Sequence, residues 1–416
     1  MKKLFFTFVI LSLSVSYAQE VLVEKNPPEH ISTIIFTADD NKQQVQFPLV
    51  RVGESFTLYF DDLNADEAVY YYRITHCDYD WKPSRLLKSE YIKGMDDQYL
   101  QPVANSYATL QPYSHYQLTL PNNLTRITLT GNYLLTINDQ WGEEVFSRRF
   151  VIYNPIVGVV VDVKRARDLT FFDTKQTVQF SVKEQQMRLQ NPKETVKTTI
   201  LQNYRWDTAV YELKPQYTLG NELIYRYDQE SAFWGGNEYF NFDNKDIRMA
   251  MTGVYRVEQN QLFEHFLFAN PSRANRVYTY FPDINGNFLI HTVNGQNPST
   301  EADYAWVHFA LEAQPAYWNK EIYVYGKFSN YAITPQYQLQ YNDETGLFEG
   351  KVLMKQGFYN YNFAIKEGQN IDFDTIGGNF FQTENTYLVL VYYRAPGAIY
   401  DQVIGVGAAS STNITR

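Results

Sequence analysis

The sequence predicts an all-β protein built of tandem immunoglobulin/fibronectin-like β-sandwich domains. Runs of alternating apolar and polar residues dominate the chain, and no amphipathic helix of convincing length interrupts them. The chain contains 35 Tyr and 28 Phe, residue types that suit half-buried strands. Short segments rich in Asn and Gly separate the runs, as is typical of hairpin turns.

The alternating runs are assigned to strands. They are Ser55–Phe60, Val69–Thr75, Gln117–Leu120, Tyr133–Ile137, Val145–Tyr153, Val157–Val163 and Thr177–Val182. The clearest hairpin is expected between Val277–Phe281 and Phe288–Val293, because Asn285-Gly286 can supply the positive φ angles of a tight turn. Two more turns are predicted at Asn138–Glu143 and Asn342–Gly346.

The first 18 residues predict a cleavable secretory signal peptide. Lys2 and Lys3 form a positive start, Leu4–Val15 is largely apolar, and Ser16-Tyr17-Ala18 is a small-residue cleavage site. A dozen residues in a helix rise about 18 Å, too short for the roughly 30 Å hydrocarbon core of a membrane. We therefore expect an exported chain that starts at Gln19 and has no direct membrane insertion.

Chain length predicts several domains. We place an N-terminal β-sandwich at residues 19–155, a central one at 156–312, a third unit at 313–395 and a C-terminal tail at 396–416. The divisions follow Asn154-Pro155 and the segment Ala313–Ala316. The formal net charge of −10 argues against nucleic acid as a partner. With Cys77 as the only cysteine, no internal disulfide is possible.

Several motifs imitate catalytic or ligand sites. His76-Cys77-Asp78 resembles a Cys-His pair, but neighbouring residues of a strand point to opposite faces and cannot act together. Gly405–Ser410 imitates a dinucleotide loop without the helix that should follow it. We expect a packed cysteine and a structural histidine, and no catalytic or cofactor-binding residues. Paired carboxylates for glycoside hydrolysis stay open, because the fold decides which carboxylates meet.

Two acidic segments have part of the spacing of a calcium loop. In Asp62-x-Asn64-x-Asp66, Glu67 stands where the essential Gly belongs, and Arg73 replaces the bidentate Glu. Asp283-x-Asn285-x-Asn287 fails similarly. We therefore assign no metal ligands and expect solvated turns. The many Tyr side chains could serve a binding surface, although most should lie on half-buried strand faces.

The chain resembles the type IX secretion system plug protein family. The stretches that carry the resemblance are Tyr72–Trp81, Ser84, Glu90–Gly94, Ser114–Tyr116, Pro121-Asn122, Thr130–Tyr133, Phe146–Phe150, Arg165–Asp168, Tyr204–Asp207 and Gly236–Glu238. The resemblance implies a non-catalytic periplasmic accessory without cofactors. It would close the periplasmic opening of its partner, a large outer-membrane translocon barrel, and associate with the outer membrane only through that partner. The partner interface is unknown at this stage.

The third unit is similar to glycogen-binding-type early-set modules. Tyr323–Tyr331 and Gly357–Phe363 carry this likeness. Where such modules often present a Trp to sugar, this chain has Tyr331. The alternative function is therefore a periplasmic or surface carbohydrate-binding protein.

Overall fold

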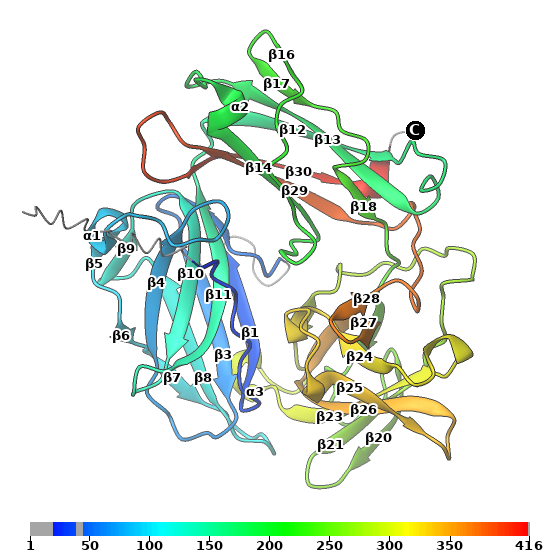
Figure 1. The fold of residues 1–416 in the computed structure, drawn as a ribbon. Coiled ribbons are helices and arrows are strands. Elements are labelled where there is room, and N and C mark those ends of the chain that lie inside the picture. The colour runs from blue at the N-terminus through cyan, green and yellow to red at the C-terminus, as the bar shows by residue number, and fades with distance from the viewer. Residues whose placement is uncertain (1–19, 39–44, 415–416) are drawn as a thin grey trace, which may run out of the picture.

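The computed structural model describes residues 20–38 and 45–414, which form three β-sheet lobes (Figure 1). The predicted signal peptide, residues 1–18, lies outside these ranges. The predicted all-β, sandwich-type fold is confirmed, and all seven alternating runs coincide with strands. The helices of the described ranges are single turns: α1 (Lys88–Tyr91), α2 (Pro192–Thr195), α3 (Pro298–Glu301), η2 (Pro315–Tyr317), η3 (Lys327–Ser329), η4 (Pro335–Tyr337) and η5 (Ser411–Asn413).

The first sandwich packs two sheets face to face. One has the order β1 (Ile31–Ala38), β3 (Phe56–Asp62), β8 (Ser114–Leu120) and β7 (Val103–Asn105). The other has the order β2 (Leu49–Arg51), β11 (Glu144–Tyr153), β10 (Gly131–Asn138), β4 (Tyr71–Cys77) and β6 (Gln98–Tyr99), and β5 (Ile92–Gly94) pairs with β9 (Thr125–Ile127). Aromatic rings fill the core between them, as where Phe60 stacks on Tyr116 with ring centroids 4.8 Å apart.

The second sandwich combines segments that are far apart in the sequence. One sheet has the order β12 (Val157–Arg165), β13 (Lys175–Glu184), β17 (Glu222–Tyr225) and β16 (Tyr217–Leu219), with β18 (Ala232–Trp234) beside β13. The other has the order β15 (Val210–Tyr211), β14 (Val196–Gln202), β29 (Thr386–Tyr393) and β30 (Gln402–Ser410). The red C-terminal strands therefore lie within the green lobe in Figure 1.

The third lobe is a ten-stranded sheet that folds over itself. Its main path runs β19 (Phe240–Asp243), β27 (Gly357–Glu367), β24 (Glu321–Tyr325), β25 (Gln338–Asn342), β26 (Leu347–Lys355), β23 (Tyr304–Glu312), β21 (Phe263–Leu267) and β20 (Val254–Gln259). Strands β22 (Phe288–Ile290) and β28 (Asn370–Asp372) also pair with β27. Phe242 of β19 contacts Phe309 of β23 with ring centroids 5.9 Å apart, so distant parts of the sheet enclose one core.

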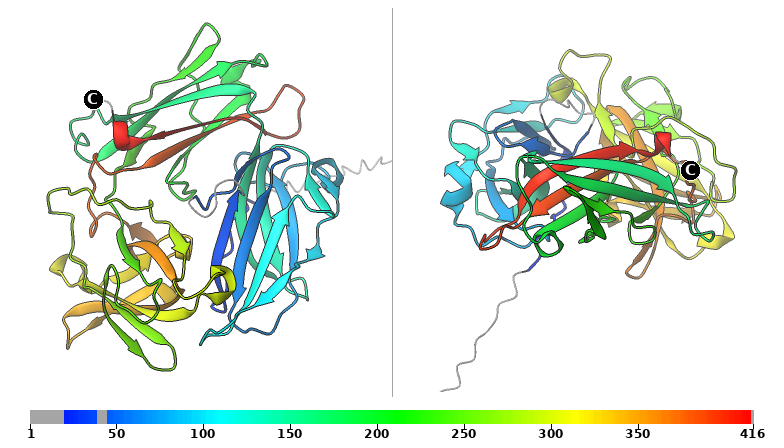
Figure 2. Two further views of the ribbon diagram at one scale, coloured as in Figure 1. Left: turned by 180° about the vertical axis from the view of Figure 1, so that it is seen from behind. Right: turned by 90° about the horizontal axis from the view of Figure 1, so that it is seen from above.

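The sheet pairing differs from the divisions expected at residues 312 and 395. Strand β23, expected in the central unit, pairs with β26 of the third lobe. Strand β29, expected in the third unit, pairs with β14 of the second. The third lobe is thus inserted between β18 and β29, and Figure 2 shows the lobes from two further directions. Alternation locates strands but does not say which strands pair across a long insertion.

The hairpin predicted around Asn285-Gly286 is wrong, although its turn exists. Asn285 and Gly286 have the expected positive φ angles of 53° and 80°. Val277–Phe281, however, is irregular, and β22 pairs with Gly357–Tyr359 instead. The turn packs against Tyr239, whose ring would lie 2.7 Å from a Cβ added at Gly286. The turns predicted at Asn138–Glu143 and Asn342–Gly346 do join strands, β10 to β11 and β25 to β26.

The expected loose tail is instead the edge strand of the second sandwich. Strand β30 pairs with β29 from Thr386 to Tyr393, and its other side faces β12 of the opposite sheet. A Cβ added at Gly407 would lie 2.7 Å from Val159 Cγ1 and 2.8 Å from the Val159 carbonyl oxygen. The glycines of Gly405–Ser410 therefore allow two sheets to approach closely, which explains the motif without a nucleotide.

We predict that Gly407→Val lowers the free energy of unfolding by about 1–3 kcal/mol, because added bulk in a packed interior forces a backbone shift. The matched control is Ala408→Val on the same strand, where the side chain is exposed. Urea titration followed by circular dichroism measures both variants. Equal stability of the two variants would contradict the close approach of β30 to β12.

Candidate functional site at the junction of the three sandwiches

A buried ion pair joins the first sandwich to the third lobe. Asp61 of β3 accepts hydrogen bonds from Lys355 Nζ at 2.7 Å and from the Tyr304 hydroxyl at 2.7 Å. Its other carboxylate oxygen lies 2.6 Å from His115 Nδ1. The side chains of Asp61 and Lys355 are 0% and 1% exposed. We call Asp61, His115, Tyr304 and Lys355 the Asp61 cluster.

Charge compensation keeps the Asp61 carboxylate ionised. Burial opposes the charge of Asp61, but Lys355 and His115 outweigh it and hold the pKa of the carboxyl below its ordinary value. Lys355 Nζ also donates to the carbonyl of Ser299 at 2.7 Å. A buried pair with further hydrogen bonds fixes geometry, because removing one partner leaves a charge without solvent.

Neighbouring contacts extend this seam. The Tyr113 hydroxyl donates to the Ala302 carbonyl at 2.8 Å. The backbone amides of Leu110 and Gln111 donate to the two carboxylate oxygens of Asp303 at 2.7 and 3.2 Å. The loop before β8 is thereby held to the start of β23.

A second, partly buried group of charged residues joins the first sandwich to the second. Arg394 Nη2 lies 2.8 Å from Asp78 and 2.7 Å from Asp401. The backbone amide of Tyr79 donates to Asp401 at 3.2 Å, and the amide of Asp401 donates to Asp78 at 3.2 Å. Asp78, the last residue of the motif that resembled a catalytic site, is therefore part of an inter-domain contact.

Aromatic and amide contacts complete this seam. Trp81 has a φ of 63°, which is uncommon for a bulky residue, and its ring meets Trp206 edge-on at 4.7 Å. Arg149 lies 4.3 Å from the Trp81 ring. The Tyr392 hydroxyl donates to Asn132 Oδ1 at 2.9 Å. The stretches Tyr72–Trp81, Thr130–Tyr133 and Tyr204–Asp207 thus meet at one interface.

A third seam joins the second sandwich to the inserted lobe. The Arg205 guanidinium, in the loop after β14, lies 4.9 Å from the centre of the Phe373 ring of the inserted lobe. Glu238 accepts from Tyr278 and from the amide of Glu384, and burial raises the pKa of Glu238 to about 7. The Gly236–Glu238 motif therefore lies where the chain passes between the two lobes.

Tyr331, the position expected to present a sugar platform, lies at the centre of the junction. It is half-buried, and the Arg205 guanidinium stands 4.5 Å from its ring. Its hydroxyl donates to the Asn285 carbonyl at 3.4 Å. A ring covered by Arg205 cannot stack flat against a sugar, so this position does not favour carbohydrate binding.

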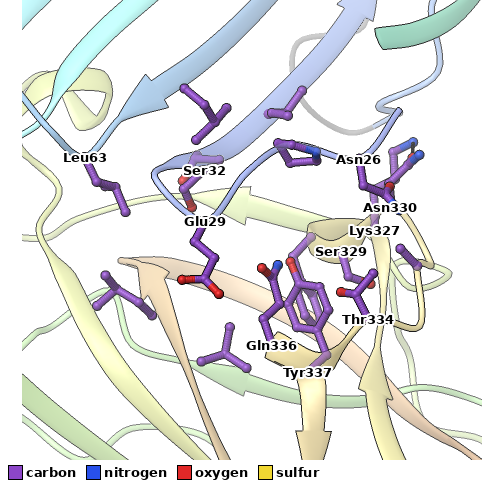
Figure 3. Close-up of a pocket in the computed structure, with 18 of the residues that line it drawn as sticks. Asn26, Glu29, Ser32, Leu63, Lys327, Ser329, Asn330, Thr334, Gln336 and Tyr337 are labelled. Carbon is purple, nitrogen blue, oxygen red and sulfur yellow. Dashed lines mark hydrogen bonds between the residues drawn. The ribbon is translucent and has the colours of Figure 1, made fainter. Parts of the chain in front are cut away.

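Two adjoining cavities open at the junction. One has a volume of about 560 Å³ and the other about 320 Å³. Figure 3 shows the larger cavity between the segment leading into β1 and the turns η3 and η4. The residues that line both cavities are Asn26, Phe36, Arg148, Lys327, Asn330 and Ala332. We call the two cavities together the junction cleft.

His76 and Cys77 are both buried but are not arranged for catalysis. His76 Nε2 lies 3.2 Å from the Thr130 carbonyl, and its ring packs edge-on against Tyr133 at 4.8 Å. Burial lowers the pKa of His76 to about 4 and raises the pKa of Cys77 to about 12. At neutral pH the thiol is therefore protonated, whereas a nucleophilic cysteine needs a thiolate.

The two acidic segments use their oxygens within the protein. Asp62 accepts from the Asn64 amide at 3.0 Å and from the Tyr70 hydroxyl at 2.8 Å. Asp283 accepts from the amides of Asn285 at 2.7 Å and Tyr239 at 2.5 Å. In the part of the chain that the structure describes, no group of three or more His, Cys, Asp or Glu could hold a metal ion. Within the same ranges, none of the helices is long and apolar enough to cross a membrane.

We predict that the free energy of unfolding depends more steeply on pH in the wild-type chain than in a variant without His76. Its pKa is about 4 in the folded chain and near 6.5 when unfolded, so between these values the unfolded state binds more protons. The free energy of unfolding therefore falls as pH falls, by about 2 kcal/mol from this group between about pH 7 and about pH 5. His76→Gln, which can still donate to Thr130, should reduce the pH dependence by that amount in urea titrations. An unchanged pH dependence would contradict a neutral buried imidazole.

Sequence reasoning missed the residues that decide these contacts. Asp61, Lys355, Arg394 and Asp401 stand in no motif, and Lys355 is 294 residues from Asp61. His115 and Asp78 were in motif stretches, but their partners could not be read from spacing. An acid within the apolar strand β3 was the one available signal.

Comparisons with known proteins bear on these observations. Residues 31–154 match the family model described as type 9 secretion system plug protein 1st domain. The chain is also similar to a crystal structure of a hypothetical protein from Parabacteroides merdae, with 29% sequence identity and a TM-score of 0.87. That match covers 94% of this chain and 100% of the other. No curated protein matches. The overall fold thus recurs in another protein.

Proposed function

We propose, from the premise that residues 31–154 are the first domain of a type IX secretion system plug protein, that this chain occludes the periplasmic opening of the outer-membrane translocon pore. The coarser conclusion, a role related to type IX secretion, rests on the family match itself. Occlusion, a periplasmic location and the translocon barrel as partner are our proposals.

The proposal rests on one observation, which is that contacts between the three lobes hold them together as one body. Each pair of lobes shares a seam with contacts of charged side chains, and several of the motif stretches lie in those seams. A body that closes a pore must resist bending, because a flexible chain of domains would leave gaps. The buried ion pair suits this task, because its charges and hydrogen bonds are satisfied in only one relative arrangement of the lobes.

The same observations support a non-catalytic role. The residues that resembled a catalytic pair are a protonated thiol and an imidazole engaged with a carbonyl. The charged side chains of Asp61, Lys355 and Arg394 instead form contacts between lobes. We propose that the protein stays at the outer membrane through its partner and uses no cofactor.

The proposal is tested in cells that carry a type IX system. Affinity-tagged chain should recover the translocon barrel, and deletion of the chain should increase sensitivity to antibiotics too large for ordinary porins. Deleting the translocon barrel as well should abolish that increase, because the leak then has no pore. The wild-type chain supplied in trans is the control and should restore resistance.

Two results would overturn the proposal. One is failure of the tagged chain to recover the barrel together with unchanged antibiotic sensitivity after deletion. The other is a leak that persists in the double deletion, because the route would then lie elsewhere.

A further inference from the structure

The junction cleft contains an arginine that forms no ion pair with the described residues. Arg148 of β11 is 7% exposed. Its Nη1 donates to the Ser147 carbonyl at 2.7 Å and to the Lys25 carbonyl at 3.2 Å. Within residues 20–38 and 45–414, neither Nε nor Nη2 has a hydrogen-bond acceptor. These two groups form one edge of the guanidinium plane, so a complete two-donor edge remains free.

A lysine faces the same space. Lys327 of η3 donates to Asn330 Oδ1 at 3.2 Å, and no carboxylate of the described chain lies within ion-pair distance of it. Burial lowers the pKa of Lys327 to about 8, which shows how little compensation its charge receives. Figure 3 shows Lys327 and Asn330 together at one end of the cavity.

Glu24 is the carboxylate that favours the charge of both cations, and its two oxygens already accept hydrogen bonds from other groups. Glu24 accepts from the backbone amide of Arg149 at 2.6 Å through one oxygen and from Asn330 Nδ2 at 2.8 Å through the other. Asp207 is paired with Arg205. At the exposed rim, Glu29 and Lys351 carry opposite charges. The inner part of the cleft therefore holds more positive than negative charge.

We propose that the junction cleft binds an organic carboxylate that has an apolar body. The free edge of Arg148 offers two parallel donors, which match the two oxygens of a planar carboxylate. Lys327 supplies a second positive charge beside it. Phe36, Phe328 and Tyr337 line the larger cavity and can cover an apolar body. This assignment goes beyond the secretion role and does not depend on it.

Phosphate is a weaker match to the same groups. Arginine and lysine also recognise phosphate, but a tetrahedral anion makes less use of one planar edge and none of the aromatic wall. Binding of inorganic phosphate in place of carboxylate is therefore an outcome that would overturn the assignment.

The test uses benzoate as the probe, titrated calorimetrically into the mature chain. Benzamide is the neutral control of the same shape, and inorganic phosphate is the second probe. We expect benzoate to bind and benzamide to bind at least about tenfold more weakly. Arg148→Gln and Lys327→Met should each weaken benzoate binding at least about tenfold, whereas Arg126→Gln, an exposed arginine of the same sandwich, should leave it unchanged.

Two further readouts separate binding from a change in folding. In crystals soaked with 4-bromobenzoate, the bromine should appear inside the larger cavity of the wild-type chain and be absent in Lys327→Met. Benzoate affinity should fall as pH rises through about 8, where Lys327 loses its proton beside Arg148, Glu24 and Asp207, and Lys327→Met should remove that pH dependence. The proposal is overturned if benzoate does not bind at millimolar concentration, if benzamide binds equally well, or if the bromine lies elsewhere.

Discussion

Asp61→Asn is expected to lower the free energy of unfolding by about 3–5 kcal/mol, because it leaves the buried cation of Lys355 without its counter-charge. Lys355 is 1% exposed, so water cannot replace the lost carboxylate. The asparagine is nearly the same size, which leaves packing intact and isolates the electrostatic effect. Urea titration of the chain without residues 1–18 measures the loss.

The control for Asp61→Asn is the surface pair Arg73–Asp97, whose side chains are 45% and 56% exposed. Asp97→Asn should cost less than about 1 kcal/mol, since solvent screens this pair. In the double variant Asp61→Asn with Lys355→Met, the free energy of unfolding should fall by less than the sum of the decreases in the two single variants. The reason is that the double variant leaves neither charge unpaired. Additive losses would show that Asp61 and Lys355 do not act as a pair.

The Asp61 cluster should also make the seam between the first and third lobes sensitive to acid. The pKa of Asp61 lies below its ordinary value, so the unfolded carboxyl takes up a proton at a higher pH than the folded one. The stability from Asp61 is therefore present above its unfolded pKa and is lost as pH falls through the folded pKa. The seam between the first and third lobes should therefore weaken in acid.

Removal of residues 402–416 is expected to abolish folding of the second sandwich. Val403 and Ile404 are fully buried, and burying each side chain contributes about 1.5–3 kcal/mol. The deletion also unpairs β29 from Thr386 to Tyr393 and uncovers β12. Together these losses approach the whole stability of a typical domain, about 5–15 kcal/mol.

A chain ending at Ser411 is the matched control for this deletion. It keeps β30 and the hydrogen bond that the Asn385 amide donates to Ser411 Oγ at 2.8 Å. Limited proteolysis and circular dichroism should show a folded second sandwich in this control and an unfolded one in the longer deletion. A cooperative transition unchanged in the longer deletion would mean that the C-terminal strand is dispensable, against the structure.

Some of the junction was predictable from the sequence. The motif stretches around Tyr72–Trp81 and Tyr204–Asp207 drew attention to residues that the structure places in the seams. Trp81 and Trp206 are far apart in the sequence, however, and only their contact shows what the motifs do. Tyr331 stands where similar modules often present a Trp to sugar, but Arg205 lies over its ring.

The sequence by itself determined the strands and the all-β class, because alternation of apolar and polar residues is a local property of the chain. It also showed that stability must come from burial, since Cys77 has no cysteine to pair with. The tertiary structure alone decided that β29 and β30 return to the second sandwich and that Asp61 meets Lys355. Such pairings are set by how whole lobes dock, and residues hundreds of positions apart carry no local trace of their contact.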